Sequence, residues 1–154
     1  MNDLILRSKA SWGYPDDLME LWTPDLVVTE TDLEMRQFFV GFFSDRLVLL
    51  YSLSKQSRNS CELEDCWVEP KLMGTGLGRA IFQDIELRMK QNEWISLRIV
   101  SDPSAAGFYL RMGAVRVGEA PSQPAGRMLP VFEWRPQECR AEEVTDAKTD
   151  HVPG

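Results

Sequence analysis

Histidine and cysteine are scarce in this sequence. The single histidine is His151, close to the C-terminal end, and the three cysteines, Cys61, Cys66 and Cys139, do not have the spacing of metal ligands. The sequence therefore argues against a catalytic centre built on histidine, against a zinc site and against a disulfide scaffold. We expect reduced thiols and no bound metal.

Long apolar runs and an excess of positive charge are also missing. The longest apolar runs, 38–43 and 47–51, fall far short of the roughly 20 residues that cross a bilayer. The first residues do not have the pattern of a signal peptide. The formal net charge is -7, whereas domains that bind nucleic acid are typically basic. We therefore expect a cytoplasmic protein that binds neither a membrane nor nucleic acid.

The chain has the length and composition of one soluble domain. Its 154 residues, 44% of them hydrophobic, suffice for a sizeable core. From Pro136 onward the residues become acidic and polar without periodicity. We therefore expect one domain over residues 1–135 and a disordered acidic tail over residues 136–154.

Local patterns predict a mixed order of helices and strands. The spacing of four between Ile81, Ile85 and Met89 gives one apolar helix face, and the segment Thr23–Asp25, with its proline, is expected to end the second helix. In chain order we predict helices over 3–11 and 16–22, strands over 37–43, 46–54 and 61–68, a helix from 77, a strand over 94–100, a helix after 102, and strands over 114–117 and 128–134. This order predicts a single α/β (α+β) domain with one main sheet.

Three glycines lie where the third predicted strand of the meander gives way to a helix. Gly74, Gly76 and Gly78 let the backbone turn sharply and leave N–H groups uncovered, and the start of the helix adds free N–H groups and partial positive charge. The segment predicts an anion site, most plausibly for a phosphate. Arg79-Ala80 excludes a P-loop, and the glycine spacing does not fit the dinucleotide fingerprint. A tight strand-to-helix connection without a ligand is the alternative.

Two motifs in the correct order resemble the GNAT superfamily of N-acetyltransferases. The segment 73–78 matches the acetyl-CoA loop of that family, and 102–109, followed by Met112-Gly113-Ala114, matches the start of its fourth helix. The segment 8–14 also looks like one bacterial subgroup of the family. The resemblance covers about residues 4–134.

The resemblance implies a mixed, mostly antiparallel central sheet flanked by helices. Relatives usually begin with a strand before the first helix, and that strand is missing from this sequence, which starts within the helix. The apolar strand that contains Phe38 and Phe43 would then be an uncovered edge. We therefore expect self-association through this edge, giving a homodimer.

The resemblance also implies that acetyl-CoA is the cosubstrate. It assigns the pyrophosphate to the backbone N–H groups of the glycine loop, the pantetheine arm to the backbone of Val68 and the thioester oxygen to the N–H of Cys66. The residues so implied for the cofactor are Cys66, Val68, Met73, Gly74, Thr75, Gly76, Leu77, Gly78, Arg79 and Asp102. Two of them depart from the family pattern: Met73 replaces a Gln or Arg, and Asp102 replaces an Asn.

For catalysis, the resemblance matches Tyr109 to the general acid that protonates the departing thiolate; a core tyrosine is the alternative. Glu62 falls where several relatives carry a catalytic base. Glu64 shares its strand face by the period of two unless a bulge intervenes, and Asp65 points the other way. A solvated strand face or a substrate-binding carboxylate is the alternative for both glutamates. Trp12, Tyr14 and Trp22 are candidates for the acceptor pocket or for the core.

The resemblance implies transfer of an acetyl group to a primary amine on a small-molecule or peptidyl acceptor. The two glutamates and the net charge favour a cationic acceptor. Two alternatives remain open: a longer acyl donor, and a GNAT-like module that binds acyl-CoA without turnover.

Overall fold

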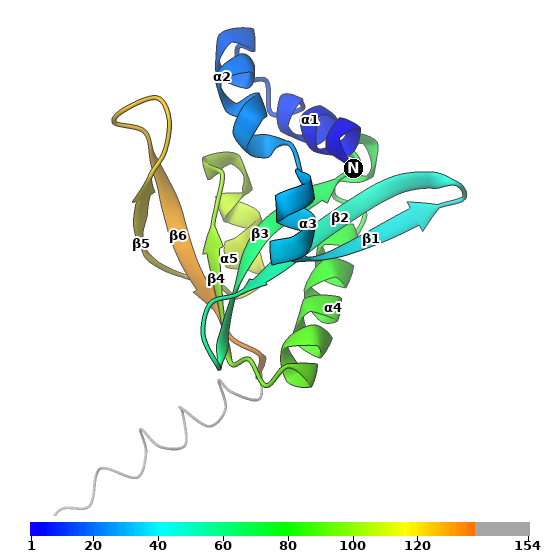
Figure 1. Cartoon of the computed structure of the whole chain (residues 1–154), viewed down its shortest axis with the longest axis vertical. Coiled ribbons are helices and arrows are strands. Elements are labelled where there is room, and N and C mark those ends of the chain that lie inside the picture. The colour runs from blue at the N-terminus through cyan, green and yellow to red at the C-terminus, as the bar shows by residue number, and fades with distance from the viewer. Residues whose placement is uncertain (138–154) are drawn as a thin grey trace, which may run out of the picture.

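The computed structural model describes residues 1–137. Six strands form one sheet in the order β1-β2-β3-β4-β6-β5 (Figure 1). The helices are α1 (Asn2–Ala10), α2 (Asp16–Leu26), α3 (Glu30–Met35), α4 (Leu77–Gln91) and α5 (Ala106–Arg111), with short 3-10 helices η1 (Pro70–Leu72) and η2 (Pro103–Ala105). The strands are β1 (Gln37–Phe43), β2 (Arg46–Lys55), β3 (Ser60–Val68), β4 (Ser96–Val100), β5 (Val115–Pro121) and β6 (Met128–Trp134). This is the expected mixed, mostly antiparallel fold.

The core has two parts, one on each face of the sheet. Alternation along β2 sends Leu50 to one face and its neighbour Tyr51 to the other. Leu50 packs with Leu4 and Ile5 of α1. On the opposite face, the apolar stripe of α4 packs against β2, β3 and β4, together with aromatic side chains of α5 and β6. Figure 1 shows α1 and α4 on the two sides of the sheet.

The pairing between β3 and β4 is short, and it positions the site. These two strands are parallel, and their register runs from Ser60↔Ser96 to Leu63↔Ile99. Beyond that point β3 continues to Val68 while β4 leads into the turn at Asp102. The two strands therefore separate, and the sheet opens on the side of α4 and α5.

Helix α2 continues past the expected stop. Pro24 lies inside the helix, which ends at Leu26. The proline removes one N–H donor from the helix. The last turn persists because the N–H of Val27 donates to the carbonyl oxygen of Thr23 at 3.1 Å, and the Thr23 hydroxyl donates to that of Met19 at 2.6 Å.

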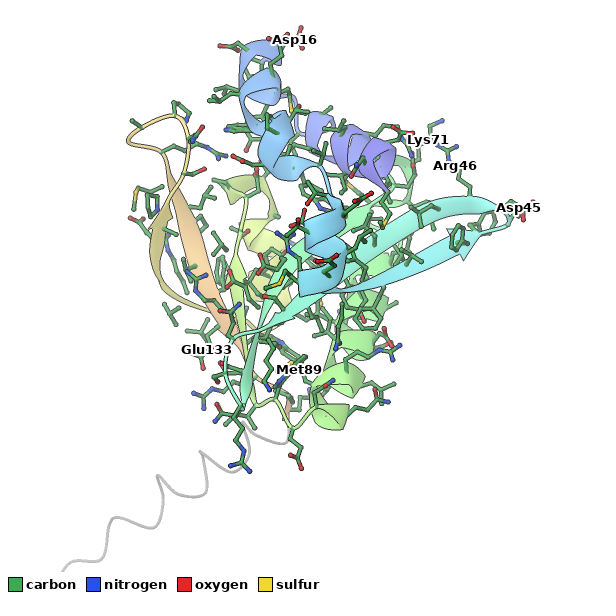
Figure 2. The ribbon with its side chains drawn as sticks, viewed as in Figure 1. Asp16, Asp45, Arg46, Lys71, Met89 and Glu133 are labelled. Atoms are coloured by element: carbon green, nitrogen blue, oxygen red, sulfur yellow. The ribbon has the colours of Figure 1, made fainter. Side chains whose placement is uncertain are left out.

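Strand β1 is an edge of the described sheet, and its outer half is apolar. Phe42 is 62% exposed and Phe43 is 74% exposed. The far end of the β1–β2 hairpin projects beyond the helices, with Asp45 and Arg46 at its tip (Figures 1 and 2). Self-association through this edge stays a prediction.

Two other expectations concern the ends of the fold and its surroundings. The acidic tail falls, beyond Gln137, outside the described residues. Within the described part of the chain, no helix has the length and apolar character needed to cross a membrane.

Candidate active site

A cavity of about 460 Å³ opens where β3 and β4 separate. Its walls come from the second half of β3, the glycine loop, the turn after β4 and helix α5. Ten of the residues predicted for the site line it: Glu64, Cys66, Val68, Met73, Gly74, Gly76, Gly78, Arg79, Asp102 and Tyr109. Glu62, Thr75 and Leu77 do not.

The three glycines of the loop serve two different purposes. Gly74 and Gly76 have φ values of 78° and 93°, in the left-handed region that favours glycine. Gly78 lies within α4, where a Cβ would come within 2.6 Å of the Phe108 ring. Turn geometry therefore requires the first two glycines, and close packing against α5 requires the third.

The start of α4 faces the cavity without a side-chain cap. Gly76 is the N-cap residue, and no side chain there accepts a hydrogen bond from the helix. The N–H groups of the first helical turn therefore have no partner within the helix, and the helix dipole makes this end positive. The Thr75 hydroxyl points back to the carbonyl oxygen of Leu72, at 2.5 Å. Backbone N–H groups and the Arg79 side chain are what this end offers to an anion.

Tyr109 is both a core residue and a cavity residue. Its side chain is 7% exposed and its ring packs near those of Phe82, Phe108 and Phe132. Its hydroxyl is hydrogen-bonded to the Cys66 thiol, and both residues line the cavity. Burial, followed by the nearby Cys66, raises the pKa of Tyr109 well above its ordinary value. The phenol is therefore held in its proton-bearing form.

The Cys66 thiol is protonated for the same reason. Burial raises the pKa of Cys66 to about 12. A nucleophilic cysteine requires the opposite shift, toward the thiolate. Cys66 is therefore positioned to hydrogen-bond with Tyr109 and is not an activated nucleophile.

The two candidate glutamates occupy different surroundings. Glu64 lines the cavity, and its Oε1 accepts a hydrogen bond from the Ser54 hydroxyl at 2.6 Å. Glu62 lies outside the cavity wall, where its Oε1 accepts from Arg98 Nη1 at 2.6 Å. Burial, with Glu64 as a further cause, raises the pKa of Glu62. The structure therefore gives Glu64, and not Glu62, direct access to a molecule in the cavity.

The expectation that Asp65 points away from Glu62 is wrong. The pairing of β3 with β2 shifts between Ser52↔Asp65 and Leu53↔Leu63, so Glu64 is an extra residue on β3. Leu63 and Cys66 therefore pack on the same face, and Glu62 and Asp65 share the other. Asp65 is buried there, bonded to the Ser52 hydroxyl at 2.5 Å.

Asp102 begins the turn that leads to Tyr109. Its Oδ1 accepts from the N–H of Ser104 at 2.8 Å, as predicted for a capping residue, and also from the Tyr14 hydroxyl at 2.8 Å. Its Oδ2 forms an ion pair with Lys9 of α1. Burial alone would raise the pKa of Asp102, but the hydrogen bonds from Lys9 and from the Ser104 N–H lower it below its ordinary value.

The candidate aromatic residues of the N-terminal region separate into two groups. Trp12 is 41% exposed and lines the cavity. Tyr14 and Trp22 do not; their rings meet edge to face at 4.8 Å and hold Lys9 between them and Asp102. The sequence analysis missed Lys9, although its position four residues after the buried Ile5 places it on the inner face of α1.

Sequence reasoning also missed residues that complete the cavity wall. They are Ser8, Leu63, Trp67, Leu72, Val100, Ala105, Phe108, Arg111 and Met112. Most of them flank predicted motif residues, so proximity in sequence was the available signal. Within residues 1–137, no group of three or more His, Cys, Asp or Glu side chains is placed to hold a metal ion.

Several solved structures share this fold. PaiA N-acetyltransferase from Thermoplasma acidophilum, solved with coenzyme A, superposes with a TM-score of 0.70 at 14% identity, over 88% of this chain and 90% of that one. A GNAT family acetyltransferase from Elizabethkingia anophelis with acetyl-CoA bound gives 0.64 at 15% identity, over 87% and 89%. An aminoglycoside 6'-N-acetyltransferase complexed with coenzyme A gives 0.65 at 16% identity, over 87% of each chain.

Sequence comparison gives an independent result. A search of curated proteins found no significant match. Residues 20–129, however, match the family described as Acetyltransferase (GNAT) domain. That match covers most of the chain and includes β3, the glycine loop, α4 and α5. The chain therefore belongs to the GNAT acetyltransferase domain family.

Proposed function

We propose that the protein is an N-acetyltransferase that moves an acetyl group from acetyl-CoA to a primary amine. One observation carries this proposal: a single cavity joins the uncapped start of α4 to the hydroxyl of Tyr109. The first can bind a pyrophosphate through backbone N–H groups. The second can supply a proton at the other end of an extended cofactor.

The cofactor would enter between the separated strands. The pyrophosphate would bind at residues 73–78, with Arg79 close to the phosphates. The pantetheine arm would lie along β3 near Val68, where β4 no longer pairs, in the manner of an added strand. The N–H of Cys66 would then face the thioester oxygen, and one such donor can lower a barrier by roughly 3–4 kcal/mol.

The chemistry would be a direct transfer. The amine nitrogen, once deprotonated, attacks the thioester carbonyl carbon; the C–S bond then breaks and the acetyl group remains on nitrogen. Glu64 would accept the proton of the amine, directly or through water, because its carboxylate lines the cavity. Tyr109 would donate a proton to the departing thiolate.

A cationic acceptor suits the wall around Glu64. Trp12 and Glu64 are both exposed in the cavity, so a cation could contact a carboxylate and an aromatic face. Lys9 lies deeper and is already paired with Asp102, so it does not present a free positive charge there.

A combined assay tests this function. Thiol release from acetyl-CoA would be followed against a panel of polyamines, lysine peptides and aminoglycosides, beside a thermal-shift titration with acetyl-CoA. We expect stabilisation by acetyl-CoA and turnover with at least one amine. Stabilisation without turnover on any amine would instead identify a module that binds acyl-CoA. No stabilisation at all would contradict both functions.

A further inference from the structure

Behind the cavity wall lies a buried cluster of two cations, one carboxylate and two aromatic rings. Lys9 pairs with Asp102, and their side chains are only 7% and 12% exposed. The ammonium group of Lys9 lies 4.6 Å from the centre of the Trp22 ring, and the guanidinium of Arg127 lies 4.3 Å from it. Both cations also lie within 6 Å of the Tyr14 ring.

The cluster joins parts of the chain that are far apart in sequence. Lys9 is on α1, Trp22 on α2 and Arg127 on the connection between β5 and β6. Trp22 Nε1 also donates to the carbonyl oxygen of Gln123 at 2.8 Å, which attaches the same connection to α2. All of these contacts converge on Asp102, because Arg127 Nη2 lies 3.7 Å from its Oδ2.

Asp102 connects the cluster to the cavity. It lines the cavity wall and caps the turn that leads into α5, so its position sets where Tyr109 begins. Ser8, next to Lys9, and Trp12, one turn further along, line the same cavity from α1 and its end. A shift of Asp102 would therefore move Tyr109 relative to the wall that faces an acceptor.

We infer that the Lys9–Asp102 ion pair is a positioning device, resting on the proposed function, that fastens α1 and the β5–β6 connection to the turn that precedes Tyr109. Lys9 and Arg127 act through Asp102 and do not touch the reacting atoms. The glycine loop has no contact with the cluster, so the seat for the pyrophosphate is held independently of it.

Charge balance gives the pair a second effect. Asp102 carries a negative charge on the wall of a cavity in which the proposed reaction releases a thiolate. Lys9 neutralises that charge at contact distance, and Arg127 contributes from 3.7 Å. Removing Asp102 alone would leave two buried cations without their carboxylate, which is strongly unfavourable, whereas removing both members of the pair is nearly neutral.

Four variants separate positioning from general stability. They are Asp102→Asn, Lys9→Met, the double variant that combines them, and a control that neutralises the exposed Arg116–Glu119 pair of β5 (Arg116→Met with Glu119→Gln). Hydrogen–deuterium exchange would be measured on the free proteins over residues 105–110 and 121–128. Affinity for coenzyme A would be measured by calorimetry. Both kcat and KM would be measured with the amine that turns over fastest in the panel.

We expect exchange over both segments to rise together by about tenfold in Asp102→Asn, less in Lys9→Met, and to return to within about threefold of wild type in the double variant. We expect kcat to fall and the KM for the amine to rise in the single variants, while the dissociation constant for coenzyme A changes by less than about threefold. The exposed-pair control should match wild type.

Two results would overturn the inference: a double variant as impaired as the sum of the single ones, or exchange that rises equally throughout the sheet. If the wild type failed to bind coenzyme A, the proposed function would fall. The exchange measurements would still decide whether Lys9 and Asp102 couple the two segments.

Discussion

Gly78 at the start of α4 lies against the ring of Phe108 on α5, so that a Cβ on Gly78 would come within 2.6 Å of the ring carbon Cε2. The contact brings the uncapped end of α4 close to the helix that carries Tyr109. The distance between the anion site and the phenol is therefore set by a glycine that leaves room for an aromatic ring.

Replacing Gly78 with alanine should weaken binding of coenzyme A. The new methyl group would force Phe108 or α4 to move, and overpacking of this kind typically costs about 1–3 kcal/mol. We expect a loss of thermal stability and at least about a tenfold weaker dissociation constant for coenzyme A, measured by calorimetry.

Gly107→Ala is the matched control, since its Cβ would meet only the flexible end of Arg111 at 3.4 Å. This change should leave binding intact and stabilise α5, because alanine favours helix by about 1 kcal/mol over glycine. Recovery in the double variant Gly78→Ala/Phe108→Leu would confirm that the ring is the obstacle. Unchanged affinity in Gly78→Ala would contradict the contact's role.

Tyr109→Phe should slow turnover without weakening the binding of coenzyme A. The ring contacts with Phe82 and Phe132 would remain, while the proton donor would be lost. We expect kcat to fall by about 10²-fold or more. Tyr51→Phe is the control, because its buried hydroxyl bonds to Asp84 and does not line the cavity. Equal kcat values for the Tyr109 variant and wild type would remove Tyr109 from the mechanism.

Glu64→Gln should reduce kcat far more than Glu62→Gln. Only Glu64 lines the cavity, whereas the Glu62 carboxylate is paired with Arg98. A lost general base typically costs about 10²–10⁴-fold in rate. Steady-state rates across a range of pH would compare the two variants with wild type. A larger loss in the Glu62 variant would assign the base to the residue outside the cavity.

Asp102 should make folding stability depend on pH in the acid range. Its pKa is lowered in the folded state, so its contribution is present above the unfolded value of about 3.9 and is lost as the pH falls through the folded value. The difference in free energy of unfolding between wild type and Asp102→Asn should be roughly 3–5 kcal/mol at pH 7. Urea unfolding should show that it narrows below about pH 4. A difference that stays constant to pH 3 would contradict this linkage.

We propose that the uncovered edge of β1 pairs with a second copy of the chain. Unpaired backbone groups on an apolar edge strand favour such contacts. Light scattering at micromolar concentration should give twice the chain mass of 17.6 kDa, and Val40→Lys with Phe42→Lys should give the monomer. Leu110→Lys, a similarly exposed position on α5, is the control. A monomeric wild type would contradict self-association.

Local chemistry was sufficient to predict the glycine turn and the cap at Asp102. In both, the deciding interaction lies within a few residues, as for Gly74, Gly76 and the bond from the Ser104 N–H to Asp102. The family resemblance added the cavity residue Tyr109, whose role the pattern of apolar residues could not distinguish from packing.

Features that depend on distant partners were not predictable in this way. The burial of Lys9 depends on Asp102, 93 residues further along the chain. The different surroundings of Glu62 and Glu64 follow from a register shift that exists only once β3 pairs with β2. The proline in α2 was a fair stop signal, but the turn that follows it supplies its own hydrogen bonds.

The short seam between β3 and β4 has a mechanical consequence. The three strands β1, β2 and β3 and the three strands β4, β6 and β5 are joined through a register that ends at Leu63 and Ile99. Each half can therefore move as a stiff plate about that seam. A molecule that lies along the free part of β3 while touching α5 would bridge the plates, so occupancy of the cavity should be felt as rigidity across the whole sheet.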